Sequence, residues 1–423
     1  MGELDYRPFP EERDDEFRAF MRYAFSPKEG PYDPEEDDDD REHLADYRGL
    51  FDGEEPVAVC GHHDFTLRIR GRDRDAAGLS AVASPPEHRR RGHIERLLNE
   101  SLTEYRGGDV RFSVLWPFEH PFYRRYGWAT VNRYRWVKTP PEQLAFAAER
   151  SADPAGDDGD GDEAGEFRRL DEDDHDAAAG LLAATAERYD FTMARTEAWW
   201  RERTLRGWKT DPYVYGFERD GDLRALLSYA FEERDDGDGR AMVVSDAAVA
   251  DPADWDRVFR FCRDHDSQVE RVRLRLPVDV SLLDRVDDPR AVTEEVRAGP
   301  MFRLVDAPAA LRELSPDPDI DAAFTLAVED PLVGWHDRPV RVAVADGEVD
   351  AERVDAGEGS SAAAAPDVTA GIGALSQLYA GYRDVDDLRA HAALDLADGA
   401  PDGLAADLAA LFPPRRTFLR EGF

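Results

Sequence analysis

The stretch that decides the fold is "GLSAVASPPEHRRRGHIERLL", residues 78–98. It predicts a strand over 79–83, a turn that contains two prolines, and a helix that begins near Ile94. The N-terminus of a helix exposes unpaired N–H groups and about half a positive charge. Three arginines at 89–91 stand directly before Gly92, which lets the backbone approach a ligand closely. The stretch therefore predicts a strand–turn–helix unit that can hold a phosphate-bearing ligand.

Two neighbouring features support this interpretation of the turn. The strand ends at Val82, Ala83 and Ser84, whose backbone groups can bind the amides of a pantetheine chain. One strand and one helix later comes "FEHPFYRRYGW", 118–128, which can place a tyrosine beside a thioester sulfur. The alternative for the turn alone is a basic helix start that pairs with surface acids, because a single Arg-x-x-Gly is common.

Charge narrows the choice of partners. The chain has 92 Asp and Glu against 54 Lys and Arg, a net charge of −38. Nucleic acid and anionic membranes repel such a surface, so neither is expected as a partner. At molar salt the Debye length is about 3 Å, so acidic self-repulsion is screened. We interpret the composition as that of a halophilic, cytoplasmic protein, whose acidity reflects the solvent.

Cysteine, histidine and apolar patterns exclude several classes. Cys60 and Cys262 lie among apolar residues, so two buried free thiols are expected and not a disulfide. Residues 1–15 carry neither a basic nor an apolar segment, so no signal peptide is expected. No apolar run approaches the roughly 18 residues that span a bilayer. His62 and His63 are adjacent and face opposite sides of a strand, and no metal site is expected.

A length of 423 residues predicts about three domains. Strands and helices predict a mixed α/β unit over 1–148, followed by an acidic linker or loop over 149–166. Residues 167–305 repeat the pattern of the first unit. The turn that should match the arginines reads "VADPADW" there, which is acidic and unsuited to an anion. A third unit of strands and helices is expected over 306–423.

Periodicity assigns faces within the first unit. Residues 65, 67 and 69 alternate with polar neighbours and predict one buried face of a strand. Residues 128–138 predict a single closing strand. Two helices are expected to bury apolar stripes. These stripes are Phe17, Phe20, Met21 and Phe25 in the first helix, and Ile94, Leu97, Leu98 and Leu102 in the second.

Taken together, residues 78–98 and "FYRRYGW" resemble the acetyl-CoA motifs of GNAT acyltransferases, and more narrowly those of the enhanced intracellular survival (Eis) type. That family has two tandem GNAT folds, of which only the first binds acetyl-CoA, followed by a domain like sterol carrier protein. "MFRLVDAPAAL", "LAVEDPLVGWHD" and "LSQLYAGYRD" resemble its third domain. The implied fold is α/β (α+β): two tandem GNAT folds with mixed sheets flanked by helices, then an α+β domain.

The resemblance implies roles for individual residues. The backbone of the strand end would hold pantetheine and the acetyl carbonyl, and the turn would wrap the diphosphate. The usual pattern has Gly or Ala where this chain has Ile94, although the Eis type tolerates a large apolar residue there. The implied acetyl-CoA residues are Val82, Ala83, Ser84, Arg89, Arg90, Arg91, Gly92, His93 and Ile94.

The resemblance also implies an acid and a base. Tyr123 falls at the position of the general acid, with Tyr126 as its rival, and the C-terminal carboxylate of Phe423 would serve as base. A thiol pKa near 8.5 and a tyrosine pKa near 10 are close enough for proton donation to the departing sulfur. An α-carboxylate with a pKa of about 3.5 is a poor base unless burial raises it, or unless it relays the proton through water.

The sequence therefore predicts an N-acetyltransferase that uses acetyl-CoA as co-substrate and no metal. Its acceptor would be a primary amine on a small molecule or a peptide, attacked directly in a ternary complex. The alternative is a binding protein that senses acetyl-CoA without turnover, or that holds an apolar ligand in its third domain. The resemblance further implies a homo-oligomer, with the hexamer as a frequent state of the family.

Overall fold

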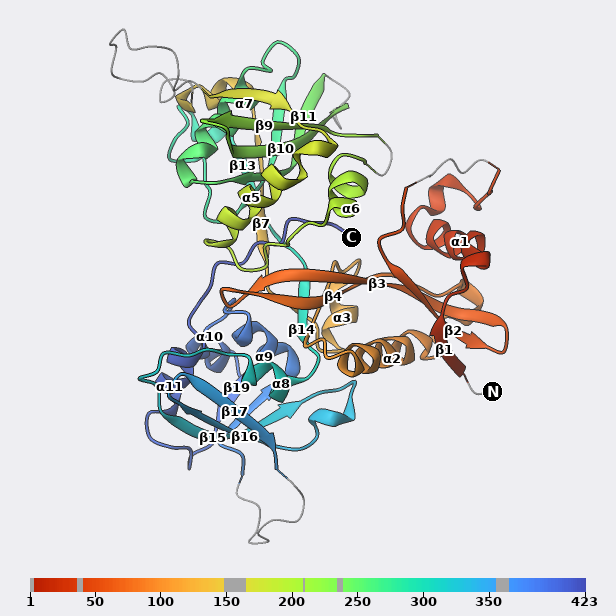
Figure 1. The fold of residues 1–423 in the computed structure, drawn as a ribbon, viewed down its shortest axis with the longest axis vertical. Helices are drawn as coiled ribbons and strands as arrows, with labels where there is room; N and C mark the ends of the chain where they lie inside the picture. The colour runs from red at the N-terminus through yellow and green to blue at the C-terminus, as the bar shows by residue number, and fades with distance from the viewer. Residues whose placement is uncertain (1–3, 36–40, 148–164, 208–209, 234–238, 355–364) are drawn as a thin grey trace.

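The structure is a computed structural model that describes residues 4–35, 41–147, 165–207, 210–233, 239–354 and 365–423. The expected acidic linker at 149–166 lies outside the described residues, apart from its last two. The described chain forms three sheets of seven, seven and five strands. In Figure 1 the second unit lies at the top and the third at the bottom, with the first sheet between them.

The first unit is a sheet in the order β1-β2-β3-β4-β5-β14-β6. The helix α2 packs on one face of it through Leu97, Leu98 and Leu102, which are fully buried as predicted. The strands are β1 (Leu4–Pro8), β2 (Asp46–Asp52), β3 (Glu55–Ile69), β4 (Arg72–Ala83), β5 (Phe112–Leu115), β6 (Ala129–Thr130) and β14 (Met301–Leu304), and the helices are α1 (Asp14–Phe25), α2 (His93–Gly107) and α3 (His120–Arg124).

The second unit repeats this arrangement in the order β8-β9-β10-β11-β12-β7-β13. Position by position, β11 and β12 therefore correspond to β4 and β5 of the first sheet. The strands are β7 (Arg133–Thr139), β8 (Glu166–Arg169), β9 (Tyr213–Arg219), β10 (Asp222–Glu233), β11 (Arg240–Val249), β12 (Arg271–Pro277) and β13 (Thr293–Ala298), and the helices are α5 (His175–Ala186), α6 (Glu197–Trp199) and α7 (Trp255–Arg263).

The third unit is a five-stranded sheet in the order β17-β16-β15-β18-β19. Its apolar core is continuous with one face of the first sheet, where Phe65, Leu67 and Phe302 join it. The strands are β15 (Ala322–Glu329), β16 (Val340–Ala345), β17 (Glu348–Arg353), β18 (Val368–Gly371) and β19 (Leu394–Leu396), and the helices are α8 (Ala307–Arg312), α9 (Ile372–Tyr379), α10 (Val385–Ala390) and α11 (Leu404–Leu411).

The prediction of one strand over 128–138 was wrong. The segment divides into β6 in the first sheet and β7 in the second, and it pairs along its length with β14 and β13. At the division, the N–H of Gly299 donates to the carbonyl of Asn132 at 2.8 Å. A ribbon of two antiparallel segments thus joins both sheets. The division of the chain at 148, 166 and 305 stays a prediction.

Other assignments from periodicity had mixed outcomes. Phe65, Leu67 and Ile69 are buried as predicted, and so is Phe17. Phe25 is 52% exposed, against the prediction, because it ends α1 and faces a cavity while Phe20, Met21 and Ala24 pack against the core. Both cysteines are free and buried, as expected.

A buried arginine joins the first unit to the third. Arg303 of β14 is fully buried, and its Nη2 lies 2.6 Å from a carboxylate oxygen of Asp330. Its Nη1 donates to the carbonyl of Tyr126, and its guanidinium lies 5.2 Å from the ring centroid of Trp128. A buried charge is stable only when paired in this way. The turn that follows α3 is therefore held by a residue about 180 positions later in the chain.

This packing makes a prediction about Gly127. Its φ is +90°, and a β-carbon there would overlap Arg303 and Ile372. We expect Gly127→Ala to lower the free energy of unfolding by about 2 kcal/mol or more. The matched control is Gly180→Ala in α5, where nothing lies within 4 Å of a β-carbon and a gain of up to about 1 kcal/mol is expected. Denaturant unfolding in molar KCl would compare them, and equal stabilities would contradict the packing argument.

Candidate active site

The first sheet separates between its parallel strands β4 and β5. These parallel neighbours pair at two positions, Ala77 with Ser113 and Gly78 with Val114. Beyond these two pairs, β4 continues to Ala83 without further pairing to β5, whereas β5 pairs with β14 along its other edge. Both strands end at the same edge because they are parallel. We call the space between them beyond Gly78 and Val114 the β4–β5 opening.

A bulge precedes the end of β4. The register against β3 shifts between Val59 and Gly61, and Ala81 has a φ of +55°. The left-handed region costs a non-glycine residue roughly 1–2 kcal/mol, so the surrounding pairing must enforce it. A bulge bends its strand and redirects the groups that follow. Here those groups are Val82, Ala83 and Ser84 at the opening.

A cavity of about 480 Å³ lies at this edge. Its volume falls within the range of ligand pockets in proteins. It joins the end of β4 to the start of α2, and α1 and the segment around α3 form its other walls. The lining residues are Ala24, Phe25, Val82, Ala83, Ser84, His88, Arg89, Arg90, Gly92, His93, Ile94, Glu95, Phe118, Glu119, Phe122, Arg125 and Tyr126.

The N-terminus of α2 is open toward this cavity. Gly92 precedes the helix with a φ of +83°, and no side chain among the described residues caps it. The first N–H groups of a helix have no partner within it, and the helix dipole adds positive potential there. A helix start of this kind can receive an anion through its backbone N–H groups.

Two of the three predicted arginines line the cavity. Arg89 donates from Nε to the carbonyl of Ser84 at 3.3 Å, and its guanidinium lies 5.4 Å from the ring centroid of Tyr23. Arg90 has a φ of +60°. Arg91 is exposed and does not line the cavity, although the other eight residues predicted for acetyl-CoA do. The sequence did not predict that five further residues line the wall, although all but the first lie within the quoted stretches 78–98 and 118–128. These residues are Phe25, His88, Phe118, Phe122 and Arg125.

Tyr123 and Tyr126 lie in different surroundings. Tyr123 is 3% exposed among the rings of Phe118, Phe122 and Trp128, and burial raises its pKa well above the usual value. Tyr126 lines the cavity and donates to Glu95 at 3.2 Å, and its pKa is raised by burial. Tyr123 is the more buried of the two, whereas the hydroxyl of Tyr126 already donates to a carboxylate.

The C-terminal residue reaches the first sheet from the opposite side. The ring of Phe423 lies 4.7 Å from that of Phe65 and 5.5 Å from that of His63. His63 pairs with Gly78, the last residue of β4 before the opening. His62 faces α2 instead, where its Nε2 lies 3.0 Å from Ser101 Oγ, so the two histidines do face opposite sides. Figure 1 marks the C-terminus between α6 and α1.

The corresponding turn of the second unit is closed to an anion. Asp254 accepts from the N–H of Asp251 at 3.1 Å, and Asp251 accepts from the N–H of Ala253 at 2.9 Å. This capping box closes the 3-10 turn Pro252–Asp254 that leads into α7, and it places two carboxylates where the first unit has arginines. Asp254 is also paired with Arg224 at 3.1 Å. The acidic turn predicted from "VADPADW" therefore puts negative charge directly before α7, which disfavours an anion there.

Among the described residues, no group of three or more histidine, cysteine, aspartate or glutamate side chains is placed to hold a metal ion. None of the helices in the described ranges is both long enough and apolar enough to cross a membrane.

Comparison with known proteins identifies the domains. An acetyltransferase (GNAT) domain model matches residues 5–131, a second one matches 192–304, and a sterol carrier protein domain model matches 307–420. An uncharacterized N-acetyltransferase of Streptomyces coelicolor is 26% identical over 296 residues, which cover 66% of this chain and 67% of that protein. The chain belongs to the GNAT N-acetyltransferases, and it combines two GNAT domains with a sterol carrier protein domain.

Solved structures share this fold over the whole chain. A GCN5-related N-acetyltransferase from Anabaena variabilis aligns with a TM-score of 0.76 at 16% identity, with 100% of both chains covered. Eis1 from Mycobacterium abscessus aligns with a TM-score of 0.70 at 21% identity, again over 100% of both chains. The predicted fold class and the resemblance to the Eis type are confirmed. Members of this family use an acyl-CoA, which agrees with the cavity described above.

Proposed function

We propose that this protein transfers an acetyl group from acetyl-CoA to a primary amine directly, in a ternary complex. The observation that carries the proposal is the cavity that joins the open start of α2 to the β4–β5 opening. The two ends of acetyl-CoA differ in what they need. The diphosphate needs cationic and N–H donors, and the acyl–pantetheine arm needs an apolar channel with free backbone groups.

The residues present fit that division. Arg89, Arg90 and the first N–H groups of α2 would bind the diphosphate. The backbone of Val82 and Ser84 would bind the arm and the acetyl carbonyl, which gains negative charge during transfer. Ser84 Oγ donates to the carbonyl of Val57 at 2.8 Å, so its side chain is already engaged. Acetyl-CoA supplies the thioester, and the chain supplies binding, orientation and proton transfer.

Tyr123 would protonate the departing sulfur. Burial raises the pKa of Tyr123, which keeps the phenol protonated but makes it a weaker acid. Donation therefore requires that the same apolar surroundings raise the pKa of the departing thiol as well. Tyr126 is the rival, since it lines the cavity. Its hydrogen bond to Glu95 must be broken or relayed before it can donate elsewhere.

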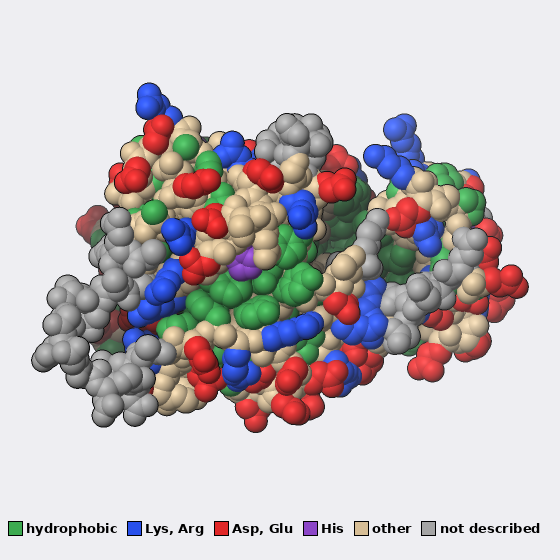
Figure 2. Space-filling model, turned by 90° about the horizontal axis from the view of Figure 1, so that it is seen from above, with side chains coloured by type: hydrophobic (Ala, Val, Ile, Leu, Met, Phe, Trp, Pro, Cys, Tyr) green, Lys and Arg blue, Asp and Glu red, His purple; other side chains and the backbone are tan. Residues whose placement is uncertain are grey.

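The terminal carboxylate of Phe423 would receive the amine proton or relay it through water. The packing of its ring against Phe65 and His63 supports this, because it brings the chain end to the place where β4 and β5 part. Figure 2 shows the surface hollowed between the second unit and the lobe that carries α1, with hydrophobic side chains in the hollow. A small-molecule amine or a lysine side chain of a peptide could approach the chain end from there.

The decisive measurement is release of free thiol from acetyl-CoA in molar KCl, with polyamines, aminoglycosides and lysine peptides as acceptors and with untagged protein. Amine-dependent turnover is expected, and a variant without Phe423 should lose it. We expect Arg89→Ala to weaken acetyl-CoA binding about tenfold, and Arg124→Ala, an exposed arginine outside the cavity, to leave binding unchanged. Cys60 and Cys262 are buried, and burial raises the pKa of Cys60 to about 12, so the native background should be low.

Two results would contradict the proposal. Acetyl-CoA binding that is lost in Arg89→Ala, without turnover on any amine, would favour an acetyl-CoA sensor or a role for the third unit in binding an apolar ligand. Full turnover without Phe423 would remove the chain end from the chemistry.

The two tyrosines can be separated by matched variants. We expect Tyr123→Phe to lower kcat about 100-fold or more, as the loss of a general acid does, with the KM for acetyl-CoA little changed. Tyr126→Phe removes only the hydrogen bond to Glu95 and should lower kcat by less than about fivefold. Steady-state kinetics on one amine would compare them. The reverse order of effects would assign the acid to Tyr126.

We also propose a homo-oligomer, with the hexamer as the first state to test. Figure 2 shows hydrophobic side chains gathered at the centre of the face seen from above the second unit. Partly exposed aromatic residues of that unit include Tyr213, at 43%, and Phe231 and Phe261. An apolar patch on an otherwise acidic surface is typical of an interface, and in a symmetric oligomer the same patch of a second copy can cover it. Light scattering in molar KCl should give a multiple of the chain mass, and a monomer would refute the proposal.

A further inference from the structure

The second unit has an opening of its own. Its parallel strands β11 and β12 pair over four residues, from Ala241 with Arg271 to Val244 with Leu274. Beyond these, β11 runs on to Val249, and β12 is held on its other side by β7. This β11–β12 opening corresponds, strand for strand, to the β4–β5 opening of the first unit.

The last residues of the chain bind at both sides of the β11–β12 opening. From β12, Arg275 donates through Nη1 to the carbonyl of Arg420 at 2.8 Å. Toward β11, Arg420 donates from Nε to the carbonyl of Ala247 at 3.3 Å. Residues 418–421 are all buried, with exposed fractions between 0 and 4%. A chain end normally frays, whereas this one is packed as tightly as a core strand.

Ion pairs of Arg195 hold residues 418–421 in place. The Glu421 side chain is 1% exposed, and its Oε1 lies 2.7 Å from Arg195 Nη2. The same guanidinium lies 2.5 Å from Asp246 of β11. One cation thus joins the chain end to the second unit. The backbone carbonyl of Glu421 accepts from Trp116 Nε1 at 2.6 Å, and Trp116 directly follows β5 of the first unit.

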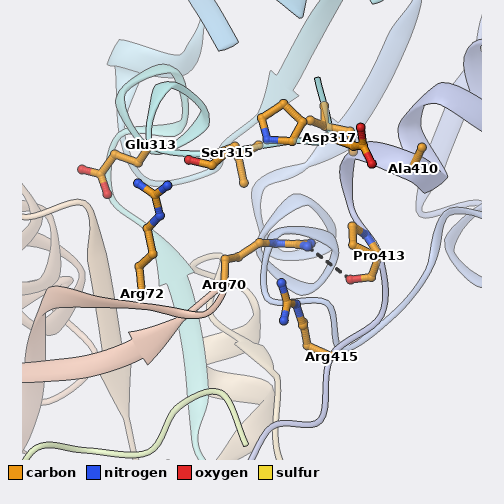
Figure 3. A pocket seen from close by; sticks show the side chains of 11 residues that line it. Arg70, Arg72, Glu313, Ser315, Asp317, Ala410, Pro413 and Arg415 are labelled. Atoms are coloured by element: carbon orange, nitrogen blue, oxygen red, sulfur yellow. Dashed lines mark hydrogen bonds between the residues drawn. The ribbon is translucent and has the colours of Figure 1, made fainter. Parts of the chain in front are cut away.

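The approach to this segment is also fixed. Figure 3 shows Arg70, from the turn between β3 and β4, reaching the carbonyl of Pro413, a bond of 3.2 Å, in a cavity of about 280 Å³ where Arg415 also lies. Further along, Phe418 donates to the carbonyl of Asp190 at 2.9 Å. We call residues 413–423 the tail. It leaves the third unit, passes the turn of the first, and enters the second.

We infer that the second GNAT unit serves as a socket for the tail, and that Arg195, Asp246 and Glu421 position the Phe423 carboxylate at the first site. The socket is the β11–β12 opening, whose counterpart in the first unit leads to the cofactor cavity. Only Gly422 and Phe423 follow Glu421, which is held by its ion pair with Arg195. Gly422 therefore allows backbone freedom at one position between the ion pair and the chain end. The part of this inference that concerns the carboxylate rests on the proposed function.

A digestion assay tests the socket without reference to activity. Carboxypeptidase A removes a C-terminal phenylalanine only when the chain end is free, so release of Phe423 from the native protein reports how firmly the tail is held. We expect Glu421→Gln and Arg195→Met each to speed this release about tenfold or more. The matched control is Asp402→Asn, which makes the same charge change at an exposed acid of the third unit. Each variant must show a cooperative thermal transition, which confirms that it is folded. If Arg195→Met does not fold, the result for Glu421→Gln decides, because this substitution keeps the shape of the side chain.

Kinetics test the positioning. We expect kcat of Glu421→Gln to fall about 10- to 100-fold, because small displacements of a reacting group cost that much. The KM for acetyl-CoA should stay within about twofold, since the first cavity is untouched. A general loss of structure would instead change both constants and the thermal transition.

Two results would overturn the inference. Release of Phe423 at the wild-type rate from both Glu421→Gln and Arg195→Met would show that the ion pair of these two residues does not hold the tail. Faster release with unchanged kcat, in a protein that needs Phe423 for turnover, would show that the ion pair does not position the carboxylate. If the wild type acetylates no amine, the proposed function fails, and the digestion assay still decides whether the socket exists.

Discussion

The guanidinium of Arg195 lies between two carboxylates, those of Asp246 and Glu421, and it is almost wholly buried. A buried charge without a partner is costly, and here Asp246 supplies one partner from within the second unit while the chain end supplies the other. Three remote parts of the chain must therefore come together at one point. The tail that meets this requirement also contacts the first unit through Trp116, so the requirement extends to the arrangement of all three units.

The two GNAT units share one strand order but differ in the charge of the turn that follows their fourth strand. In the first, the turn before α2 carries arginines, and the helix start is left free. In the second, Asp251 and Asp254 cap the turn that leads into α7 and place carboxylates there. Both sheets part after their parallel pair. The first opening leads to a cavity, and the second is filled by residues of the same chain. The two units thus differ in the charge of one turn and in what lies at the end of the parallel pair.

High salt acts unequally on these charges. At molar ionic strength, interactions between exposed charges farther apart than about 3 Å are screened, which makes a net charge of −38 tolerable. Buried pairs such as Arg303 with Asp330 and Arg195 with Glu421 are screened much less. The hydrogen bonds that an open helix start offers are short-range as well. The buried pairs that hold the fold are therefore the charges that salt affects least.

The sequence by itself determined what depends on residues close together in the chain. The strand, the arginine turn and the helix over 78–98 could be predicted from their order, and so could the acidic turn of the second unit. The tertiary structure alone decided that residues 128–138 divide between two sheets, that Arg91 lies outside the cavity, and that Arg195 meets Glu421, 226 positions away. Periodicity reports the face of an element, but it does not report which distant segment will neutralise a buried charge on that face.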